Sequence, residues 1–104
     1  MTAKQYDVCR VVGTRERAVD LVVILQDDTL DYLATRVVAP LVPASGEVEN
    51  NRIMPTVTVE GVNYLVAVQL TTSLHLRNIG GQIGSLKDSE QLIKNAIDRV
   101  LFGI

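Results

Sequence analysis

Short apolar runs separated by polar segments make up most of the chain. Residues 4–12 (KQYDVCRVV) and 19–26 (VDLVVILQ) are rich in valine, which favours strands, and the charged segment GTRERA separates them. We expect two antiparallel strands joined by a hairpin loop. Residues 35–41 (TRVVAPL) predict a third strand, and Pro40, which lacks a backbone donor, places that strand at a sheet edge or a bulge.

The middle of the chain predicts a long connection followed by another hairpin. Residues 42–51 (VPASGEVENN) have the Pro, Gly, Ser and Asn content of an exposed loop. In the next segment, IMPTVTVEGVNYLVAVQL, valines alternate with threonines before the EGVN turn. After that turn, alternation continues through Tyr64, Val66 and Val68. A sixth short strand is expected in SLHLRNI, residues 73–79.

The hydrophobic period changes from about 2 to about 3.6 after the glycine-rich segment GGQIGS, residues 80–85. We interpret these glycines as the turn from sheet to helix. From Leu86 onward we expect a helix with Ser85 as its N-cap and Asp88 in a capping-box position. Five or six short strands and one terminal helix predict a mainly β protein with a C-terminal α-helix, folded as a small barrel covered by that helix.

The predicted C-terminal helix places its only aromatic residue away from its apolar stripe. At about 100° per residue, a stripe about 60° wide holds Ile93, Ile97, Val100 and Ile104. We expect this stripe to pack on the sheet. Phe102 lies about 180° from Ile93 among polar neighbours, which fits an anchor for a partner protein. Helical spacing alone also allows Phe102 to cover an edge of the barrel or to pack in a dimer.

Length, composition and charge limit the classes of function. A chain of 104 residues with 47% hydrophobic content can bury its own core, so we expect a single domain, 1–104. Cys9 is the only cysteine, and no leader or membrane-spanning run is visible, so we expect a cytoplasmic protein without membrane contact. With a net charge of −2, the chain has no excess of basic residues for binding the phosphates of nucleic acid, so protein partners are favoured.

No group of polar residues predicts a catalytic or metal site. Asp27, Asp28 and Asp31 cluster after a strand, but the ligand spacing of a calcium loop is missing, so a solvated acidic turn is favoured. His75 is the only histidine, and nothing near it in the sequence supports a catalytic triad. The GGQIGS segment lacks the lysine of a phosphate-binding loop. We therefore expect no cofactor and no metal.

Three stretches of the chain resemble the CcdB family of plasmid and chromosomal toxins. The run LIKNAIDRVLFGI is similar to the family's C-terminal helix, which ends in an aromatic residue, Gly and Ile after an IKNAI-like segment. The stretch VILQDDTLDYLATRVVAPL is similar to the family's strand, acidic turn, Arg and IPL strand. MPTVTVEG resembles its hairpin strand. The matches follow the family's order and spacing over most of the chain.

The resemblance implies an SH3-like small barrel with a C-terminal helix, assembled as a homodimer. It also implies that the protein is the toxin of a type II toxin–antitoxin pair. Such a toxin binds the A subunit of DNA gyrase and traps the complex with cleaved DNA, and a cognate antitoxin neutralises it. In this picture the protein is not an enzyme and does not bind nucleic acid directly.

The resemblance further implies which residues contact gyrase. Carried over position by position, they are Phe102, Gly103, Ile104, Leu101, Asp98, Thr29, Leu30 and Asp31. A flat ring offers a large contact area at low entropy cost, and a glycine lets a partner approach closely. Well-known members carry Trp in place of Phe102 and two isoleucines in place of Thr29 and Leu30, so this chain presents a smaller ring and less apolar surface.

Two other functions remain open at this point. An endoribonuclease toxin on the same barrel needs cations beside the scissile phosphate and a general acid and base. The candidates for these roles are Arg10, Arg15, Arg17 or Arg36 with Asp31 or His75. The acidic charge balance and the family-like C-terminus argue against this function. The other alternative is a non-toxic homologue that keeps the fold and binds only its antitoxin.

Overall fold

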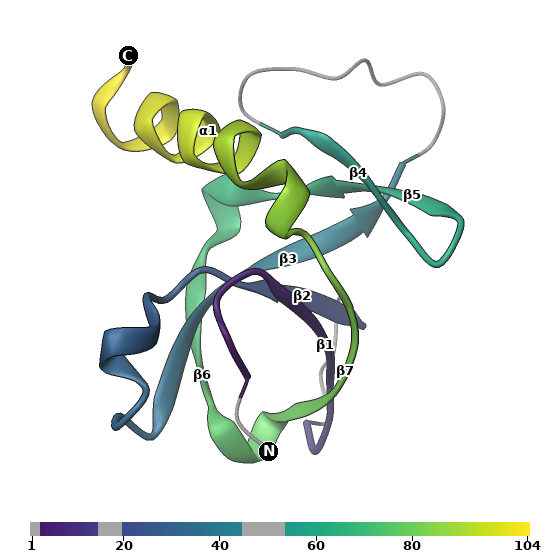
Figure 1. Ribbon diagram of the computed structural model, residues 1–104, viewed down its shortest axis with the longest axis vertical. Helices are drawn as coiled ribbons and strands as arrows, with labels where there is room; N and C mark the ends of the chain where they lie inside the picture. Colours follow the sequence, from purple (N-terminus) through teal and green to yellow (C-terminus); the bar gives the residue numbers. More distant parts are fainter. Residues whose placement is uncertain (1–2, 15–19, 45–53) are drawn as a thin grey trace.

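The computed structural model describes residues 3–14, 20–44 and 54–104, which form a curled β-sheet and one α-helix (Figure 1). The strands are β1 (Asp7–Val11), β2 (Leu21–Ile24), β3 (Thr35–Pro43), β4 (Thr56–Val59), β5 (Val62–Val66), β6 (Thr72–His75) and β7 (Ile79–Ser85). Short 3-10 turns form η1 (Asp28–Leu30), η2 (Val68–Leu70), η3 (Leu76–Asn78) and η4 (Lys87–Ser89), and the helix is α1 (Glu90–Phe102).

The strands pair antiparallel in the order β4-β5-β3-β2-β1-β7, and β6 pairs with the half of β3 that β5 leaves free. The two ends of this path approach each other: Cγ1 of Val59 in β4 lies 3.5 Å from where a Cβ added to Gly84 of β7 would stand. The sheet is therefore curled into a half-closed barrel, and α1 lies across one end of it (Figure 1). The prediction of a mainly β, SH3-like small barrel with a C-terminal helix is confirmed.

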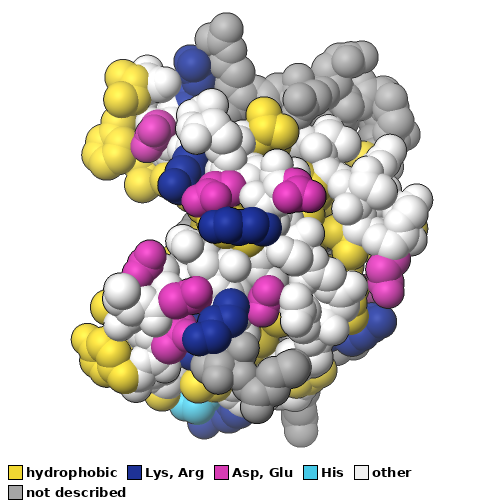
Figure 2. Space-filling view, in the orientation of Figure 1, with side chains coloured by type: hydrophobic (Ala, Val, Ile, Leu, Met, Phe, Trp, Pro, Cys, Tyr) yellow, Lys and Arg dark blue, Asp and Glu magenta, His cyan; other side chains and the backbone are white. Residues whose placement is uncertain are grey.

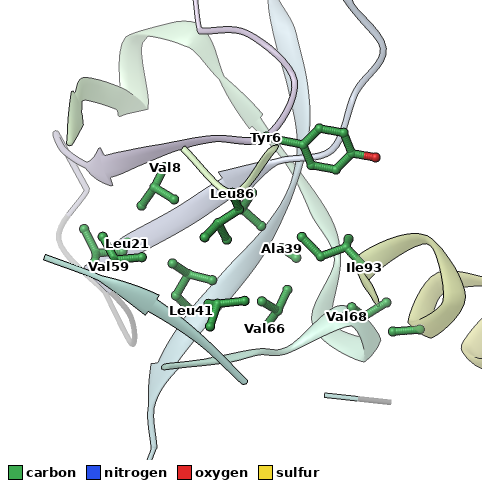
Figure 3. Packing of buried hydrophobic residues seen from close by; sticks show 13 residues of the cluster. Tyr6, Val8, Leu21, Ala39, Leu41, Val59, Val66, Val68, Leu86 and Ile93 are labelled. Carbon is green, nitrogen blue, oxygen red and sulfur yellow. The ribbon is translucent and has the colours of Figure 1, made fainter. Parts of the chain in front are cut away.

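Strand β2 is buried on both faces because the sheet separates two apolar clusters. Leu21 and Val23 belong to the larger cluster, and Val22 and Ile24 belong to the smaller one. This follows from the period of 2 in a strand, which sends successive side chains to opposite faces. Figure 3 shows the larger cluster, in which side chains of the barrel meet Ile93 of α1. The burial of Ile93 fixes the helix to the barrel.

Pro40 lies in a central strand, so the prediction that it marks an edge or a bulge is wrong. On one side it pairs with Val22 of β2 in a continuous register. On the other side β3 pairs with β6 as far as Val38 and with β5 from Leu41 onward. The Pro40 carbonyl accepts a hydrogen bond from the Ala67 N–H at 2.9 Å. The missing N–H of Pro40 therefore falls where β3 changes partner, so no ladder bond is lost.

The first predicted hairpin and the sixth predicted strand are confirmed in their described parts. β1 and β2 pair through Val8 and Val23, while residues 15–19 of the predicted loop lie outside the described residues. The predicted connection at 42–51 also lies largely outside them, and β3 continues into its start. The sixth strand is β6, which ends at His75; in the rest of the predicted segment, residues 76–78 form η3 and Ile79 begins β7.

The second hairpin forms at the predicted turn. Val59 of β4 faces Val62 of β5, and the two residues between them have φ angles of 51° (Glu60) and 78° (Gly61). Positive φ at both positions is the type I′ geometry, whose twist matches that of the flanking strands, and glycine adopts it without strain. Val68, predicted to extend the return strand, lies instead in η2.

The GGQIGS segment is part of strand β7, which corrects its interpretation as a turn. β7 pairs with β1, and its register shifts on both sides of Cys9. A Cβ added to Gly80 would stand 2.9 Å from Cγ1 of Val12 and 3.3 Å from the carbonyl oxygen of Arg10. Glycine is therefore required here for the close approach of two strands. Because glycines show no apolar alternation, the sequence pattern hides this strand.

The helix begins later than predicted. The Ser85 hydroxyl accepts a hydrogen bond from the Lys87 N–H at 3.2 Å. Leu86 is the N-cap of η4 and Ser89 is the N-cap of α1, so Ser85 does not cap the helix. Near the actual start of α1, the Glu90 carboxylate pairs with Lys87 and Lys94, each at 3.0 Å. A carboxylate in the first turn also suits the positive end of the helix dipole. Among the described residues, no helix is long and apolar enough to cross a membrane.

Cys9 is expected to be chemically inert in the folded protein. Burial raises the pKa of its thiol to about 11, and the nearby Asp7 adds to this shift. Alkylation by iodoacetamide at about pH 8 should be slow in the native protein and fast after denaturation, as followed by mass spectrometry. Because the raised pKa favours the neutral thiol in the folded state, stability should fall as the pH rises from 9.0 to about 11. Rapid alkylation of the native protein would contradict this expectation.

Candidate functional site

The C-terminal end of α1 carries exposed apolar side chains. Leu101 is 66% exposed, Phe102 70% and Ile104 74%, and we call these three residues the C-terminal patch. The opposite face of α1 is held on the barrel by the buried Ile93 and Ala96. Phe102 thus points away from the packed face, as its spacing predicts. The predicted packing stripe is wrong at Ile104, which is exposed.

Gly103 explains why Ile104 leaves the helical stripe. Gly103 has a φ of 73°, in the left-handed region, and its N–H donates a hydrogen bond to the carbonyl of Arg99 at 3.0 Å. This conformation is a common way for helices to end, and glycine adopts it without a Cβ clash. The chain therefore turns immediately after Phe102, and Ile104 no longer follows the 3.6-residue period.

The loop around η1 forms a second exposed surface. Leu30 is 40% exposed, and Thr29 beside it is exposed as well. The Asp27 carboxylate accepts hydrogen bonds from the hydroxyl and the backbone N–H of Thr29, and these bonds lower the pKa of Asp27. Tyr32 is 80% exposed and Leu33 39%, and neither was predicted as a site residue. We call the exposed residues Thr29, Leu30, Tyr32 and Leu33 the loop patch.

An apolar groove of about 270 Å³ lies on this side of the molecule. It is lined by Leu25, Val37, Val68, Thr71, Ile97, Val100 and Leu101. Figure 2 shows the molecule hollowed between the C-terminal end of α1 and the loop around η1, with hydrophobic side chains on both lips. The structure therefore brings the two patches to one side of the molecule. The valines that line this groove were not predicted as site residues, because valines in strands are normally interpreted as core residues.

The other two predicted contact residues differ in accessibility. Asp98 is exposed on α1, one turn before Phe102. The Asp31 side chain is only 17% exposed, and its carboxylate lies 2.8 Å from Nζ of Lys4 and 3.6 Å from Nη2 of Arg36. Asp31 is thus engaged within the protein, whereas Asp98 faces solvent.

Arg36 is not available for ribonuclease chemistry, which corrects its place among the candidate cations. It is 0% exposed, and Nη1 of its guanidinium donates hydrogen bonds to the carbonyls of Leu33 and Thr35 at 2.9 and 3.0 Å. A guanidinium held in this way cannot reach a phosphate at the surface. Within the described part of the chain, no group of three or more His, Cys, Asp or Glu side chains is placed to hold a metal ion.

The remaining candidates for ribonuclease chemistry have separate surroundings. His75 is exposed, and its Nδ1 accepts a hydrogen bond from the Arg77 N–H at 3.1 Å, so the ring caps η3. Arg10 is exposed on β1. Arg15 and Arg17 lie outside the described residues.

Comparisons with known proteins agree with this fold. A family model described as "CcdB protein" matches residues 5–103 of the chain. No curated protein sequence matches it. Among solved structures, the chain is similar to "Mycobacterium tuberculosis toxin MazF-mt6", with 20% identity, a TM-score of 0.72 and coverage of 90% of this chain and 94% of that one.

Two further solved structures share the fold. One is titled "Endoribonuclease in complex with its cognate antitoxin from Mycobacterial species", with 13% identity, a TM-score of 0.77 and coverage of 94% of this chain and 93% of that one. The other is "Crystal structure of Mtb toxin", with 20% identity, a TM-score of 0.72 and coverage of 90% and 99%. At these identities the likeness concerns the fold alone.

These structures correct the prediction that the protein is not an enzyme. That prediction came from the family resemblance, and the acidic charge balance and the family-like C-terminus were its arguments against ribonuclease activity. A protein with the same fold and a TM-score of 0.77 is an endoribonuclease, so the fold also supports catalysis. The prediction of a non-enzyme is therefore overturned.

Proposed function

The chain belongs to the CcdB family, and from this premise we propose that it is the toxin of a type II toxin–antitoxin pair that acts on the A subunit of DNA gyrase. In this proposal a cytoplasmic homodimer binds gyrase while the enzyme holds cleaved DNA, and a cognate antitoxin neutralises it. Family membership supports the toxin class. The fold shared with an endoribonuclease that was solved with its antitoxin supports the antitoxin partner.

The exposure of Phe102 is the observation that carries the proposed target contact. A phenylalanine that is 70% exposed contributes little to the stability of the monomer. Burying the same ring in an interface contributes about 1.5–3 kcal/mol. Leu101 and Ile104 extend the apolar area on the same patch. Exposed apolar residues at the end of a helix are therefore better explained by a partner than by packing within this chain.

The groove and the loop patch extend the proposed contact surface. A segment of the gyrase A subunit that inserts apolar side chains into the groove would touch Leu101 on one wall and Val37 on the other. Its flanks would then meet the loop patch and the C-terminal patch together. Two copies of this surface in a homodimer would suit a target that is itself two-fold symmetric.

Endoribonuclease activity is a second candidate, favoured by the TM-score of 0.77 to an endoribonuclease. Exposed residues that could serve it include His75 and Arg77 at η3, besides Arg10 on β1. Because Nδ1 of His75 accepts a hydrogen bond from the Arg77 N–H, Nε2 is the ring nitrogen left to face an RNA substrate. Arg77 would supply the cation.

A binding titration with the purified gyrase A subunit tests the proposal. Calorimetry should give one toxin dimer per gyrase A dimer, with the dimeric mass of the free protein measured by light scattering. A folded protein that releases no heat with gyrase A would exclude this target. As a comparison, the same sample is incubated with RNA. Site-specific cuts by the wild type that disappear in His75→Ala would establish endoribonuclease activity in place of gyrase binding.

A further inference from the structure

Arg36 is a fully buried charge whose guanidinium is surrounded by backbone carbonyls of the loop after η1. Nη1 donates to the carbonyls of Leu33 and Thr35, and Nη2 donates to the carbonyl of Asp31 at 3.2 Å. Nε lies 3.4 Å from the carbonyl of Ala3. A planar guanidinium with five donors in fixed directions suits this arrangement, and the carbonyls satisfy a charge that would be costly to bury alone.

Asp31 supplies the charge that balances Arg36. Its Oδ1 is buried, accepts no hydrogen bond and lies 3.6 Å from Nη2 of Arg36. Its Oδ2 pairs with the Lys4 ammonium at 2.8 Å. Both oxygens are thus directed toward cations of the same chain. Asp31 has no oxygen left to present to a partner in this conformation.

Two glutamines also hold the same loop. Gln26 is 7% exposed, and its amide nitrogen donates to the carbonyls of Leu30 and Thr35 at 3.3 and 3.1 Å. The Gln5 backbone N–H donates to the Asp28 carboxylate at 2.8 Å. The carbonyls of Leu30 and Leu33 in the loop patch are therefore bonded by buried side chains of Gln26 and Arg36, while the side chains of the patch remain exposed.

We propose that Arg36 is a positioning residue that fixes the loop patch in the shape used for target binding, and that Asp31 acts through Arg36 without touching the target. This inference rests on the proposed gyrase contact. Sequence reasoning placed Asp31 on the contact surface beside Thr29 and Leu30. The geometry assigns it to the internal support of that surface, with Lys4 as its second partner.

A double-mutant cycle separates a positioning role from a direct contact, because residues that act through each other give non-additive effects. Asp31→Asn should weaken gyrase A binding about tenfold in the wild-type background. In the Arg36→Lys background, where the carbonyl contacts are already lost, the same change should have an effect of less than about twofold. Equal losses in both backgrounds would mean that Asp31 touches the target, and the inference would be wrong.

Lys87→Met serves as the matched control for Lys4→Met. Lys87 also makes an exposed ion pair, at 3.0 Å to Glu90, but it lies at the start of the helix. Lys4→Met should weaken gyrase A binding a few-fold, and Lys87→Met should leave it unchanged. Equal effects of the two variants would count against a specific role for the Lys4–Asp31 pair.

Hydrogen exchange of the free protein tests the positioning role without gyrase. The amides of residues 30–35 should exchange faster in Arg36→Lys than in the wild type, while the amides of α1 keep their protection. Unchanged exchange in the loop would overturn the inference. If the wild type fails to bind gyrase A, the proposed function fails, and the exchange data still report whether Arg36 holds the loop.

Discussion

Phe102→Ala is expected to weaken binding to the gyrase A subunit by about 30-fold or more while the melting temperature stays unchanged. A buried aromatic anchor at an interface typically contributes at least about 2 kcal/mol, which corresponds to that loss. Phe102 is 70% exposed in the free chain, so its removal takes little packing from the monomer. Calorimetric titration gives the affinity, and thermal unfolding followed by circular dichroism gives the stability.

Leu92→Ala is the matched control for this prediction. Leu92 is also an exposed apolar residue of α1, at 47%, but it lies near the start of the helix. This variant should bind gyrase A like the wild type. A melting temperature lowered by several degrees in Phe102→Ala would instead show that the ring packs within the folded protein or its dimer, and the anchor role would be lost.

Ile93→Ala is expected to lower the free energy of unfolding by about 2–5 kcal/mol. Ile93 is 0% exposed and joins the larger apolar cluster, where it meets barrel residues such as Val68 (Figure 3). Its truncation leaves a cavity between α1 and the barrel, and the C-terminal patch loses its support. Urea denaturation measures the change, with Ile97→Ala, a partly buried neighbour, expected to have a smaller effect.

A loss below about 1 kcal/mol for Ile93→Ala would contradict the packing described for α1. Such a result would mean that the cavity collapses or that the helix is held elsewhere. The comparison with Ile97→Ala distinguishes these two cases. If Ile97→Ala has the larger effect, the helix packs through the face that lines the groove, and the groove would then be a weaker candidate for partner binding.

The strands with valine-rich or alternating patterns could be predicted from sequence because burial on one or both faces leaves a direct signature. β1, β2, β4 and β5 belong to this class. The hydrophobic pattern fails to predict a strand where a glycine has no side chain, or where the arrangement of the neighbouring strands is unusual. Gly80 lies in a strand because a second strand passes within contact distance, and Pro40 lies in a central strand because two partner strands meet there. Neither condition is visible from local sequence.

For the helix too, local sequence spacing predicted some features correctly, and contacts within the folded chain determined others. The 3.6-residue period correctly predicted that Phe102 faces away from the buried Ile93. The predicted start of the helix is too early because the short 3-10 turn η4 lies between Ser85 and α1. The position of Ile104 was misplaced because Gly103 turns the chain out of the helix. A glycine near a helix end is a signal for such a turn, although spacing alone does not show where the next residue points.

The candidate site was only partly visible in the sequence. The C-terminal patch follows from an aromatic residue on a polar helix face and from the family resemblance. The groove could not be predicted, because the residues that line it come from Leu25, β3, the η2 region and α1 and meet only after the barrel forms. Arg36 was one of four candidate cations for the ribonuclease alternative, but the structure buries it among backbone carbonyls.

A DNA cleavage assay with gyrase, ATP and supercoiled plasmid tests the central claim most directly. The wild-type protein should cause linear DNA to accumulate, because a toxin bound to the A subunit traps the enzyme after cleavage. Phe102→Ala, checked to be folded and dimeric, should leave the plasmid uncut. If the folded wild-type dimer produces no linear DNA, or if Phe102→Ala traps as much cleaved DNA as the wild type, gyrase poisoning through the C-terminal patch is contradicted.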